Sequence, residues 1–310
     1  MTKLYYADPI QDGAADPTLI RNVATNEWWM FYTNRRAHHP SKGASWINGS
    51  PIGIATSPDG IDWKYKGTVQ GLDRPEDKGL NTHWAPEIIY AKGEYHMYLT
   101  YFVGAPDNFD KSDRDLTHFT SPDLENWTRQ SILPLQKPNV MDACVAHCPD
   151  GLYRMWYKDE AHGSCTWSAT SDDLYTWQIE ELVIQGSPDH PPHEGPNVFT
   201  LSGYHWLITD EWKGLAVFRS DDMRSWVKQG YILDKPGEDL MDRSYARHAD
   251  IVVNGNEGAL FYFTHPEWDE AAKKIPETGK ERRTTIHNAR IWVENGVLLA
   301  DRNAEDIKLL

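Results

Sequence analysis

The sequence predicts an all-β fold, a single five-bladed β-propeller with a central active-site channel that extends over residues 1–310. The first observation is a repeated pattern: a serine, an aspartate two residues later, and a tryptophan four residues after that. The pattern occurs at 57–63, 121–127, 171–177 and 220–226. The tryptophans at 63, 127, 177 and 226 are therefore 64, 50 and 49 residues apart. A period near fifty is typical of a propeller or a solenoid.

The second observation is a set of five units of short strand-like segments. Aromatic and β-branched runs begin at Trp28, Tyr95, Tyr153, Tyr204 and Leu260. Gly, Asp, Asn and Pro bound these runs, which is typical of strands joined by turns. The units predict blades at residues 9–70, 84–135, 141–186, 194–235 and 247–300, and we expect residues 3–6 to pair into the last blade and close the ring. No stretch has a sustained helical period, which argues against a βα barrel.

The overall charge bears on the class of partner. The formal net charge is −15 at pH 7. This charge argues against nucleic acid or an anionic membrane as partner, because such binding relies on clusters of Lys and Arg. We expect a neutral or weakly charged ligand, and the oligomeric state stays open.

The compartment is predicted from the N-terminus and from the cysteines. No apolar segment of a secretory signal or a membrane span is visible, so we expect a cytoplasmic protein, or a secreted or periplasmic one whose leader has been removed. Cys144, Cys148 and Cys165 are odd in number, which favours a reducing compartment. Alternation along a strand places His147 opposite Cys144 and Cys148, so buried thiols are favoured over a zinc site.

Carboxylates gather at the expected start of the first strand of several blades. These strands line the channel of a propeller, so the residues that open them converge: Asp16, Trp84, Asp142, Glu194 and His248. Hydrolysis of a glycosidic bond needs one protonated and one ionised carboxyl group, and a third acid nearby can keep the donor protonated. The alternative is that Asp16 and Glu194 only cap strand starts as turn residues. Three acids at the same position of the repeat favour function.

At these residues the chain resembles glycoside hydrolase family 43 of the five-bladed furanosidase-like propellers. The resemblance rests on Asp16-Pro17, Trp84-Ala85-Pro86, Asp142, Glu194-Gly195-Pro196 and Arg247-His248-Ala249, and it covers the whole chain. It implies that Asp16 is the general base and Glu194 the general acid. It also implies that Asp142 raises the pKa of the acid and orients it. Met141-Asp142-Ala143 and His193-Glu194-Gly195 differ from the motifs of retaining relatives, which favours inversion.

Further residues are predicted to bind the substrate. The resemblance implies this role for Trp84, His248 and Arg283, and the insert at residues 34–50 adds Arg35 and Trp46, which are equally well explained as solvated loop residues. We expect this insert and the loop at 102–115 to lie over the pocket mouth. No cofactor is required by the chemistry. The resemblance allows a structural calcium at the propeller axis near His248, although calcium prefers oxygen ligands and a lone histidine is weak evidence.

The sequence therefore predicts an inverting glycoside hydrolase for arabinose- or xylose-type bonds in plant-type oligosaccharides or polysaccharides. Two alternatives remain open: a non-catalytic carbohydrate-binding propeller, and a glycosyl-transferring or phosphorolytic enzyme on the same fold. The identity of the sugar, its anomer and the choice between terminal and internal cleavage do not follow from the residues.

Overall fold

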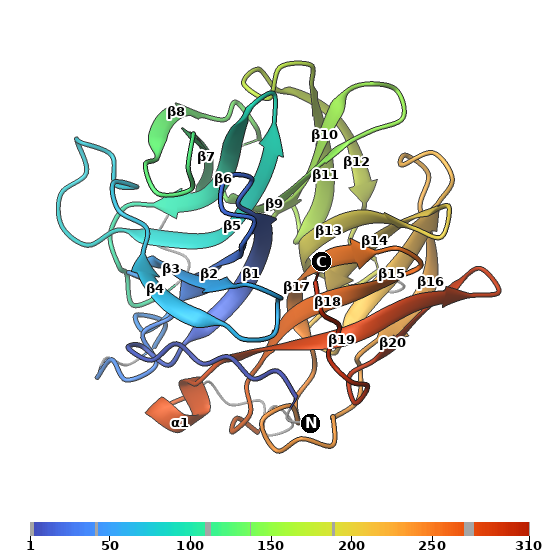
Figure 1. Ribbon diagram of the computed structural model, residues 1–310. Helices are drawn as coiled ribbons and strands as arrows, with labels where there is room; N and C mark the ends of the chain where they lie inside the picture. Colours follow the sequence, from blue (N-terminus) through green and yellow to red (C-terminus); the bar gives the residue numbers. More distant parts are fainter. Residues whose placement is uncertain are drawn as a thin grey trace.

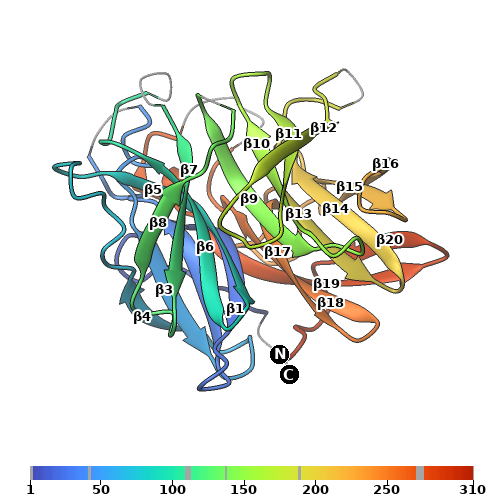
Figure 2. The same ribbon diagram turned by 90° about the horizontal axis from the view of Figure 1, so that it is seen from above.

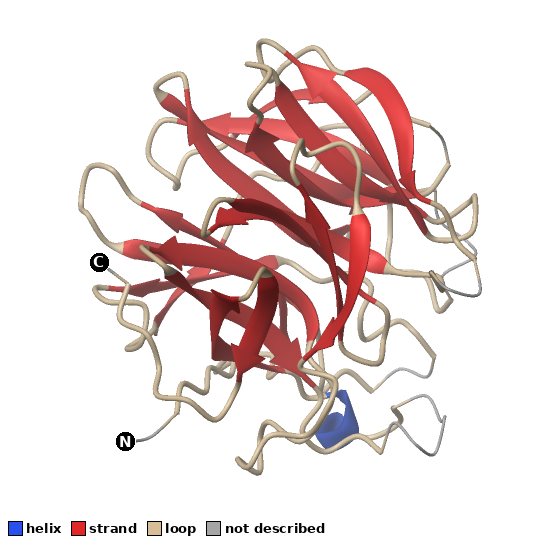
Figure 3. Cartoon of the chain, turned by 90° about the vertical axis from the view of Figure 1, so that its right-hand side faces the viewer, coloured by secondary structure: helices blue, strands red, loops and turns tan. Residues whose placement is uncertain are grey.

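A computed structural model describes residues 3–40, 43–108, 113–136, 138–187, 190–269 and 276–309. Within these ranges the twenty strands form five four-stranded sheets arranged around one axis (Figure 1). The only helix of the described residues is the short α1 (Gly279–Arg282), so the fold is all-β (Figure 3). No helix in these ranges is long and apolar enough to cross a membrane. The expected five-bladed propeller is confirmed.

Each sheet contains four consecutive antiparallel strands, so one blade is one stretch of sequence. Blades 1 and 2 consist of β1 (Ala14–Arg21), β2 (Trp28–Asn34), β3 (Ile52–Ser57), β4 (Lys64–Thr68), β5 (Thr82–Ala91), β6 (Glu94–Phe102), β7 (Asp115–Ser121) and β8 (Thr128–Ile132). Blades 3 and 4 consist of β9 (Val140–His147), β10 (Tyr153–Asp159), β11 (Cys165–Ser171), β12 (Gln178–Ile184), β13 (Glu194–Leu201), β14 (Tyr204–Asp210), β15 (Leu215–Ser220) and β16 (Val227–Ile232). Blade 5 consists of β17 (Arg247–Asn254), β18 (Glu257–Thr264), β19 (Thr285–Glu294) and β20 (Val297–Asp301).

The first strand of every blade lies at the centre. Strands β1, β5, β9, β13 and β17 contact one another in a closed ring, whereas the fourth strands lie at the rim (Figure 1). The N-terminal segment joins the last blade, since Tyr6 forms an antiparallel bridge with Ile286 of β19. The C-terminal segment returns to blade 1, where the Leu309 N–H donates to the Asp59 carbonyl at 2.8 Å. Both ends lie on the same side of the propeller (Figure 2).

The repeated serine, aspartate and tryptophan form the turn between the third and fourth strands of a blade. In blade 3, Ser171 Oγ accepts the N–H of Leu174 at 2.8 Å, and Asp173 Oδ1 accepts that of Thr176 at 2.6 Å. Trp177 Nε1 donates to the Leu174 carbonyl at 3.1 Å. Leu174 has φ 72°, a left-handed conformation that costs free energy in a branched residue and is held here by these bonds. The hydrogen bonds of the aspartate to Thr176 and Tyr175 lower its pKa to about 2.

Equivalent indole bonds occur at Trp63 and Trp127, so these tryptophans have a structural role in the turn. Blade 5 lacks the pattern because its last two strands are joined by Asn295 and Gly296, both at positive φ. Such a two-residue connection matches the twist of the strands without side-chain caps. The motif therefore stabilises the longer turns between third and fourth strands, which explains why it occurs in four of the five blades.

A β-bulge at the start of each inner strand shapes the channel. The pairing shifts register between Ala15 and Thr18 in β1, and at the corresponding place in β5, β9, β13 and β17. Residues at positive φ occupy four of these bulges: Asp16, Ala85, Asp142 and Gly195, at 50°, 41°, 54° and 56°. Bulges redirect side chains and are frequent beside active sites. Here they turn side chains at the strand start toward the axis.

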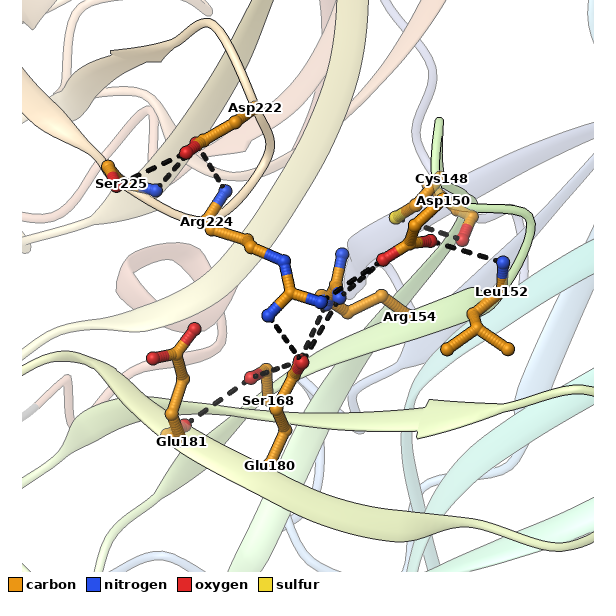
Figure 4. A network of polar contacts seen from close by, with 11 residues as sticks. Cys148, Asp150, Leu152, Arg154, Ser168, Glu180, Glu181, Asp222, Arg224 and Ser225 are labelled. Carbon is orange, nitrogen blue, oxygen red and sulfur yellow. Dashed lines mark hydrogen bonds and ion pairs between the residues drawn. The ribbon is translucent and has the colours of Figure 1, made fainter.

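A network of charges fastens blade 3 to blade 4 on the outer part of the propeller (Figure 4). Arg154 of β10 is 1% exposed and donates to Glu180 Oε2 at 2.7 Å and to Asp150 Oδ2 at 3.1 Å. Arg224, from the β15–β16 turn, contacts the same two carboxylates at 2.9 and 3.2 Å. Arg154 is thus the buried centre of the network, and Arg224 is its exposed extension from the next blade.

We expect Arg154→Met to lower the free energy of unfolding by about 3 kcal/mol, because it leaves two partly buried carboxylates without their buried cation. Arg224→Met removes a cation whose side chain is 46% exposed and should cost less than about 1 kcal/mol. Urea unfolding of both variants at pH 7 measures the difference. Equal losses would show that burial of Arg154 does not determine the strength of the network.

The cysteines are buried and unpaired. Cys144, Cys148 and Cys165 are each at most 3% exposed, as predicted for buried thiols. Burial raises the pKa of all three. Cys144 Sγ also accepts the N–H of Val198 at 3.2 Å, which links blade 3 to blade 4.

Candidate active site

A pocket of about 280 Å³ opens at the end of the channel where the bulges lie. It brings together six of the residues predicted from the sequence: Asp16, Arg35, Trp84, Asp142, Glu194 and His248. Six further residues complete its lining: Ile47, Arg114, Met141, Lys158, Glu160 and Trp212. Four carboxyl groups and three cations therefore line one small volume.

Hydrogen bonds between neighbouring blades hold the strand starts in place. The Ala85 N–H donates to Thr33 Oγ1 at 2.8 Å, and the Asp142 N–H donates to Thr100 Oγ1 at 3.1 Å. In the next blade, the Gly195 N–H donates to Asp142 Oδ2 at 3.3 Å. Each of these three bulges is thus held by a hydrogen bond to the blade before it. The propeller itself, rather than a flexible loop, fixes the position of the acids.

Asp16 lies between a cation and an imidazole. Its two carboxylate oxygens are 3.2 and 3.3 Å from one terminal nitrogen of Arg35, and Oδ1 is 3.7 Å from His248 Nδ1. Arg35 is itself fixed by stacking on Phe263, whose ring centroid is 4.6 Å away. Asp16 is 7% exposed and reaches the pocket, so it can contact only a molecule inside it.

Glu194 occupies a different place in the repeat from the other two acids. It pairs with Asp210 across β13 and β14, which makes it equivalent to Ala15 and Met141. Asp16 and Asp142 lie one residue later, inside the bulge. The expectation that all three acids share one position is therefore wrong. The longer glutamate reaches the pocket from one residue upstream, and glycine takes the bulge position.

Gly195 is required at that position because of its neighbour in the next blade. Ala85 and Asp142 adopt the same left-handed backbone in their bulges, but at Gly195, whose φ is 56°, a Cβ would come within 2.8 Å of the His248 ring. The close approach of the imidazole explains the Glu-Gly pair in physical terms. It also places His248 against the backbone beside the acid.

The charges around Glu194 differ from those expected. Its Oε2 accepts Lys158 Nζ at 3.0 Å, and its Oε1 accepts Trp212 Nε1 at 2.8 Å. Burial opposes ionisation, but the Lys158 ammonium and these hydrogen bonds outweigh it and lower the pKa of Glu194 to about 2. The resemblance implied a raised pKa. In the free protein Lys158, which the sequence reasoning did not place in the site, reverses the direction.

Asp142 is the acid of the site that resists ionisation. It is 6% exposed, and burial raises its pKa, with His248 and Lys158 opposing and Glu194 adding to the rise. Its Oδ2 also holds the Gly195 N–H. Asp142 therefore orients the segment that carries Glu194, in addition to any effect of its charge.

The two inserts form one wall of the pocket. The Trp84 indole donates to the Ile47 carbonyl at 3.2 Å, so the first insert rests on the second blade. Within the described part of the second loop, the Pro106 carbonyl accepts Asn48 Nδ2 at 2.6 Å. Arg114 lies at the end of that loop, pairs with Glu160, and is 5.5 Å from the Trp84 ring centroid. Residues 41–42 and 109–112 of the two loops lie outside the described ranges.

Two predicted substrate contacts do not line the pocket. Arg283 donates to Asp12 Oδ2 at 2.7 Å and to Glu267 Oε2 at 3.0 Å, at the edge of blade 5. Trp46 is 2% exposed and packs against His265 and Arg282. Arg283 is committed to two carboxylates, and Trp46 supports the insert from within. Neither meets a molecule in the pocket as it stands.

Sequence reasoning missed three polar pocket residues, namely Lys158, Glu160 and Arg114. Lys158 is the second-last residue of β10 and pairs with Met141, which places it opposite the bulge of its own blade. The signal was present, because Lys158 is a lysine at the inner end of an otherwise buried run, Tyr153–Asp159. Glu87, in contrast, does not line the pocket: its Oε1 accepts the Val145 N–H at 2.8 Å, a bond between blades 2 and 3.

The residues around His248 offer little for a metal. Among the described residues no group of three or more His, Cys, Asp or Glu side chains is arranged to hold an ion. Asp16, the nearest carboxylate, is engaged by Arg35. Calcium takes six to eight oxygen ligands, so this set does not fit it without water as the main ligand. No step of the chemistry below uses a metal.

Several solved structures share the fold of this chain. A thermostable family-43 glycoside hydrolase is 18% identical, with a TM-score of 0.70 over 98% of this chain and 99% of that chain. The RS223 β-xylosidase is 13% identical, with a TM-score of 0.69 over 94% and 96%. A family-43 β-1,3-galactosidase with bound galactodeoxynojirimycin is 13% identical, with a TM-score of 0.68 over 94% and 95%. At these identities the likeness shows the fold alone.

No curated protein matches the sequence. A family model does match, over residues 5–254, and its description is "Probable glycosyl hydrolase domain". The matched range contains all six predicted residues that line the pocket. The chain therefore belongs to this glycosyl hydrolase family, which is related to glycoside hydrolase family 43.

Proposed function

We propose that the protein is an inverting glycoside hydrolase that cleaves arabinose- or xylose-type bonds. The observation that supports this proposal is that Asp16, Asp142 and Glu194 line one small pocket. Glu194 would protonate the leaving oxygen, and Asp16 would remove a proton from the attacking water. Asp142 would orient the segment that carries the acid. The family implies a carbohydrate substrate, and the pentose specificity is part of the proposal.

The pocket size supports terminal cleavage. A volume of about 280 Å³ lies at the low end of the range for ligand sites, closer to one sugar ring than to a bound chain. The ring would contact Trp84 on one side and the Asp16–Arg35 pair on another. Glu194 is ionised in the free pocket, so it would take up its proton as the sugar enters, displaces water and weakens the pairing with Lys158.

The distribution of cations does not favour a phosphorolytic reaction. Arg35, Lys158 and Arg114 each face a carboxylate of the site, namely Asp16, Glu194 and Glu160. A phosphate would have to compete with these carboxylates for every cation. Water is therefore the better-supported acceptor.

Glu194→Gln separates hydrolysis from simple sugar binding. We expect the variant to lose at least about a hundredfold in kcat/KM on aryl pentosides with poor leaving groups, while it still binds the pentose, because only the proton donor is removed. A panel of aryl pentosides and hexosides identifies the substrate, and NMR of the fresh product gives its anomer. Retention of configuration would contradict the inverting assignment. A wild-type protein that binds sugars but hydrolyses no member of the panel would favour a binding module.

A further inference from the structure

Trp212 differs from the other aromatic residues of the pocket. It lies in the β14–β15 connection, is 37% exposed, and lines the pocket beside the acid. Trp84, the other tryptophan of the lining, is only 9% exposed and is enclosed by Phe102 and the first insert. One tryptophan therefore belongs to the enclosed part of the pocket and the other to its rim.

The backbone of Trp212 is held in an unfavourable conformation. Its φ is 56°, in the left-handed region that is a genuine outlier for a bulky residue. Its N–H donates to Asp210 Oδ1 at 2.6 Å, and Asp210 is fully buried. The preceding Glu211 is 5% exposed and accepts Lys228 Nζ at 2.8 Å. Two buried acids thus anchor the turn, and strain that is held in this way is typical of functional sites.

The side chain of Trp212 is fixed as well. Its indole Nε1 donates to Glu194 Oε1 at 2.8 Å, and Lys158 Nζ lies 5.7 Å from its ring centroid. An exposed indole would otherwise sample several rotamers and lose entropy on binding a ligand. The contacts with Glu194 and Lys158 remove that cost in advance, which is the condition for a tight binding surface.

We propose that Trp212 is the platform for the leaving sugar, an uncharged ring that stacks on the exposed part of the indole. The proposal rests on the hydrolase function above, since a general acid must lie beside the leaving oxygen. Glu194 bonds directly to the indole, so the ring attached to that oxygen passes next to Trp212. The enclosed part of the pocket beside Trp84 then takes the ring whose bond is cleaved. The same indole N–H orients the acid, so binding of the leaving sugar and placement of the proton donor are linked.

The test compares Trp212→Ala with Trp212→Phe on two probes. Xylobiose or arabinobiose, whichever the wild type cleaves, carries a leaving sugar, whereas the matching glycosyl fluoride carries neither a leaving sugar nor a need for the acid. We expect Trp212→Ala to raise KM for the disaccharide about tenfold, which corresponds to the binding free energy of one aromatic contact. The rise in KM for the glycosyl fluoride should be much smaller. Trp212→Phe keeps the ring and loses the N–H, so its KM should stay within about threefold of wild type.

The matched control is Tyr90→Ala, which removes an aromatic residue that is 42% exposed at the other end of β5 from Trp84. This variant should leave KM for both the disaccharide and the glycosyl fluoride unchanged. Equal losses of Trp212→Ala on both probes, or equal KM values of the Ala and Phe variants on the disaccharide, would overturn the platform. If the wild type cleaves nothing, the proposed function fails. Calorimetric binding of xylobiose then decides: weaker binding by Trp212→Ala than by wild type supports the platform, and equal binding or none overturns it.

Discussion

Asp16→Asn is expected to lower kcat/KM by about 10⁴-fold on every cleaved glycoside, with little change in stability. The amide has the size of the carboxylate and can still accept one bond from Arg35, which contacts both oxygens of Asp16. It cannot accept a proton from the attacking water. The loss should therefore be similar for good and poor leaving groups, in contrast to Glu194→Gln, whose loss grows as the leaving group becomes poorer. Steady-state kinetics on a series of aryl pentosides measures this contrast.

An inverting mechanism also predicts that Asp16 forms no covalent intermediate. The residue acts on water and forms no bond to the sugar, so a 2-deoxy-2-fluoro pentoside should leave the intact mass of the wild-type protein unchanged. A covalent adduct on Asp16 would show that it is a nucleophile and that configuration is retained. Thermal unfolding of Asp16→Asn controls for loss of the fold. A large fall in melting temperature would attribute the lost activity to the Arg35 pair rather than to the base.

The blades could be predicted from the sequence because each one repeats the same local physics. The Ser–Asp–Trp turn satisfies its own backbone, as at Ser171, Asp173 and Trp177, so it marks the same place in every blade that uses it. Alternating strands with aromatic residues follow at regular spacing. The start of the inner strands could be located for the same reason.

The detail of the site could not be predicted because it depends on bulges. A bulge adds one residue to a strand without a sequence signal, so Glu194 and Asp142 were assigned to one position although they differ by one. The glycine of Glu194-Gly195 was visible in the sequence. Its reason, the approach of the His248 ring to within 2.8 Å of a Cβ, depends on the neighbouring blade.

Ion pairing is the second reason why the detail of the site could not be predicted from the sequence. The resemblance implies a sugar contact for Arg283, yet Asp12 and Glu267 occupy its guanidinium. Lys158 looked like a polar strand end, yet it is 3% exposed and bonded to Glu194. Which partner a long charged side chain meets is decided by tertiary contacts. The sequence places such residues near a site but does not assign them to it.

The Lys158–Glu194 pair has the larger consequence, because it sets the protonation state of the acid. With Lys158 present, the pKa of Glu194 is lowered to about 2 from its ordinary value of 4.5. A lowered pKa in the folded state contributes stability that is present above the ordinary pKa and is lost as the pH falls toward 2. The wild type should therefore lose this contribution progressively between pH 4.5 and pH 2.

We expect Lys158→Met to raise the pKa of Glu194 above 4.5, since burial, the largest of the effects on this group, then outweighs the remaining bond from Trp212 and the charge of His248. The buried carboxylate lacks its cation at pH 7, so the variant should lose about 3 kcal/mol of unfolding free energy there, and the loss should shrink below pH 4.5, where Glu194 is protonated. Lys158→Arg keeps the charge and should keep the wild-type profile. Carboxyl ¹³C NMR titration, with Glu194→Gln to assign the signal, measures the pKa directly.

The change in pKa also has a kinetic consequence. At neutral pH the protonated fraction of Glu194 should rise about tenfold for each unit by which its pKa rises. The rate of Lys158→Met on substrates with poor leaving groups should therefore rise relative to its rate on the glycosyl fluoride. An unchanged pKa of Glu194 in Lys158→Met would show that another group holds the acid in its ionised form.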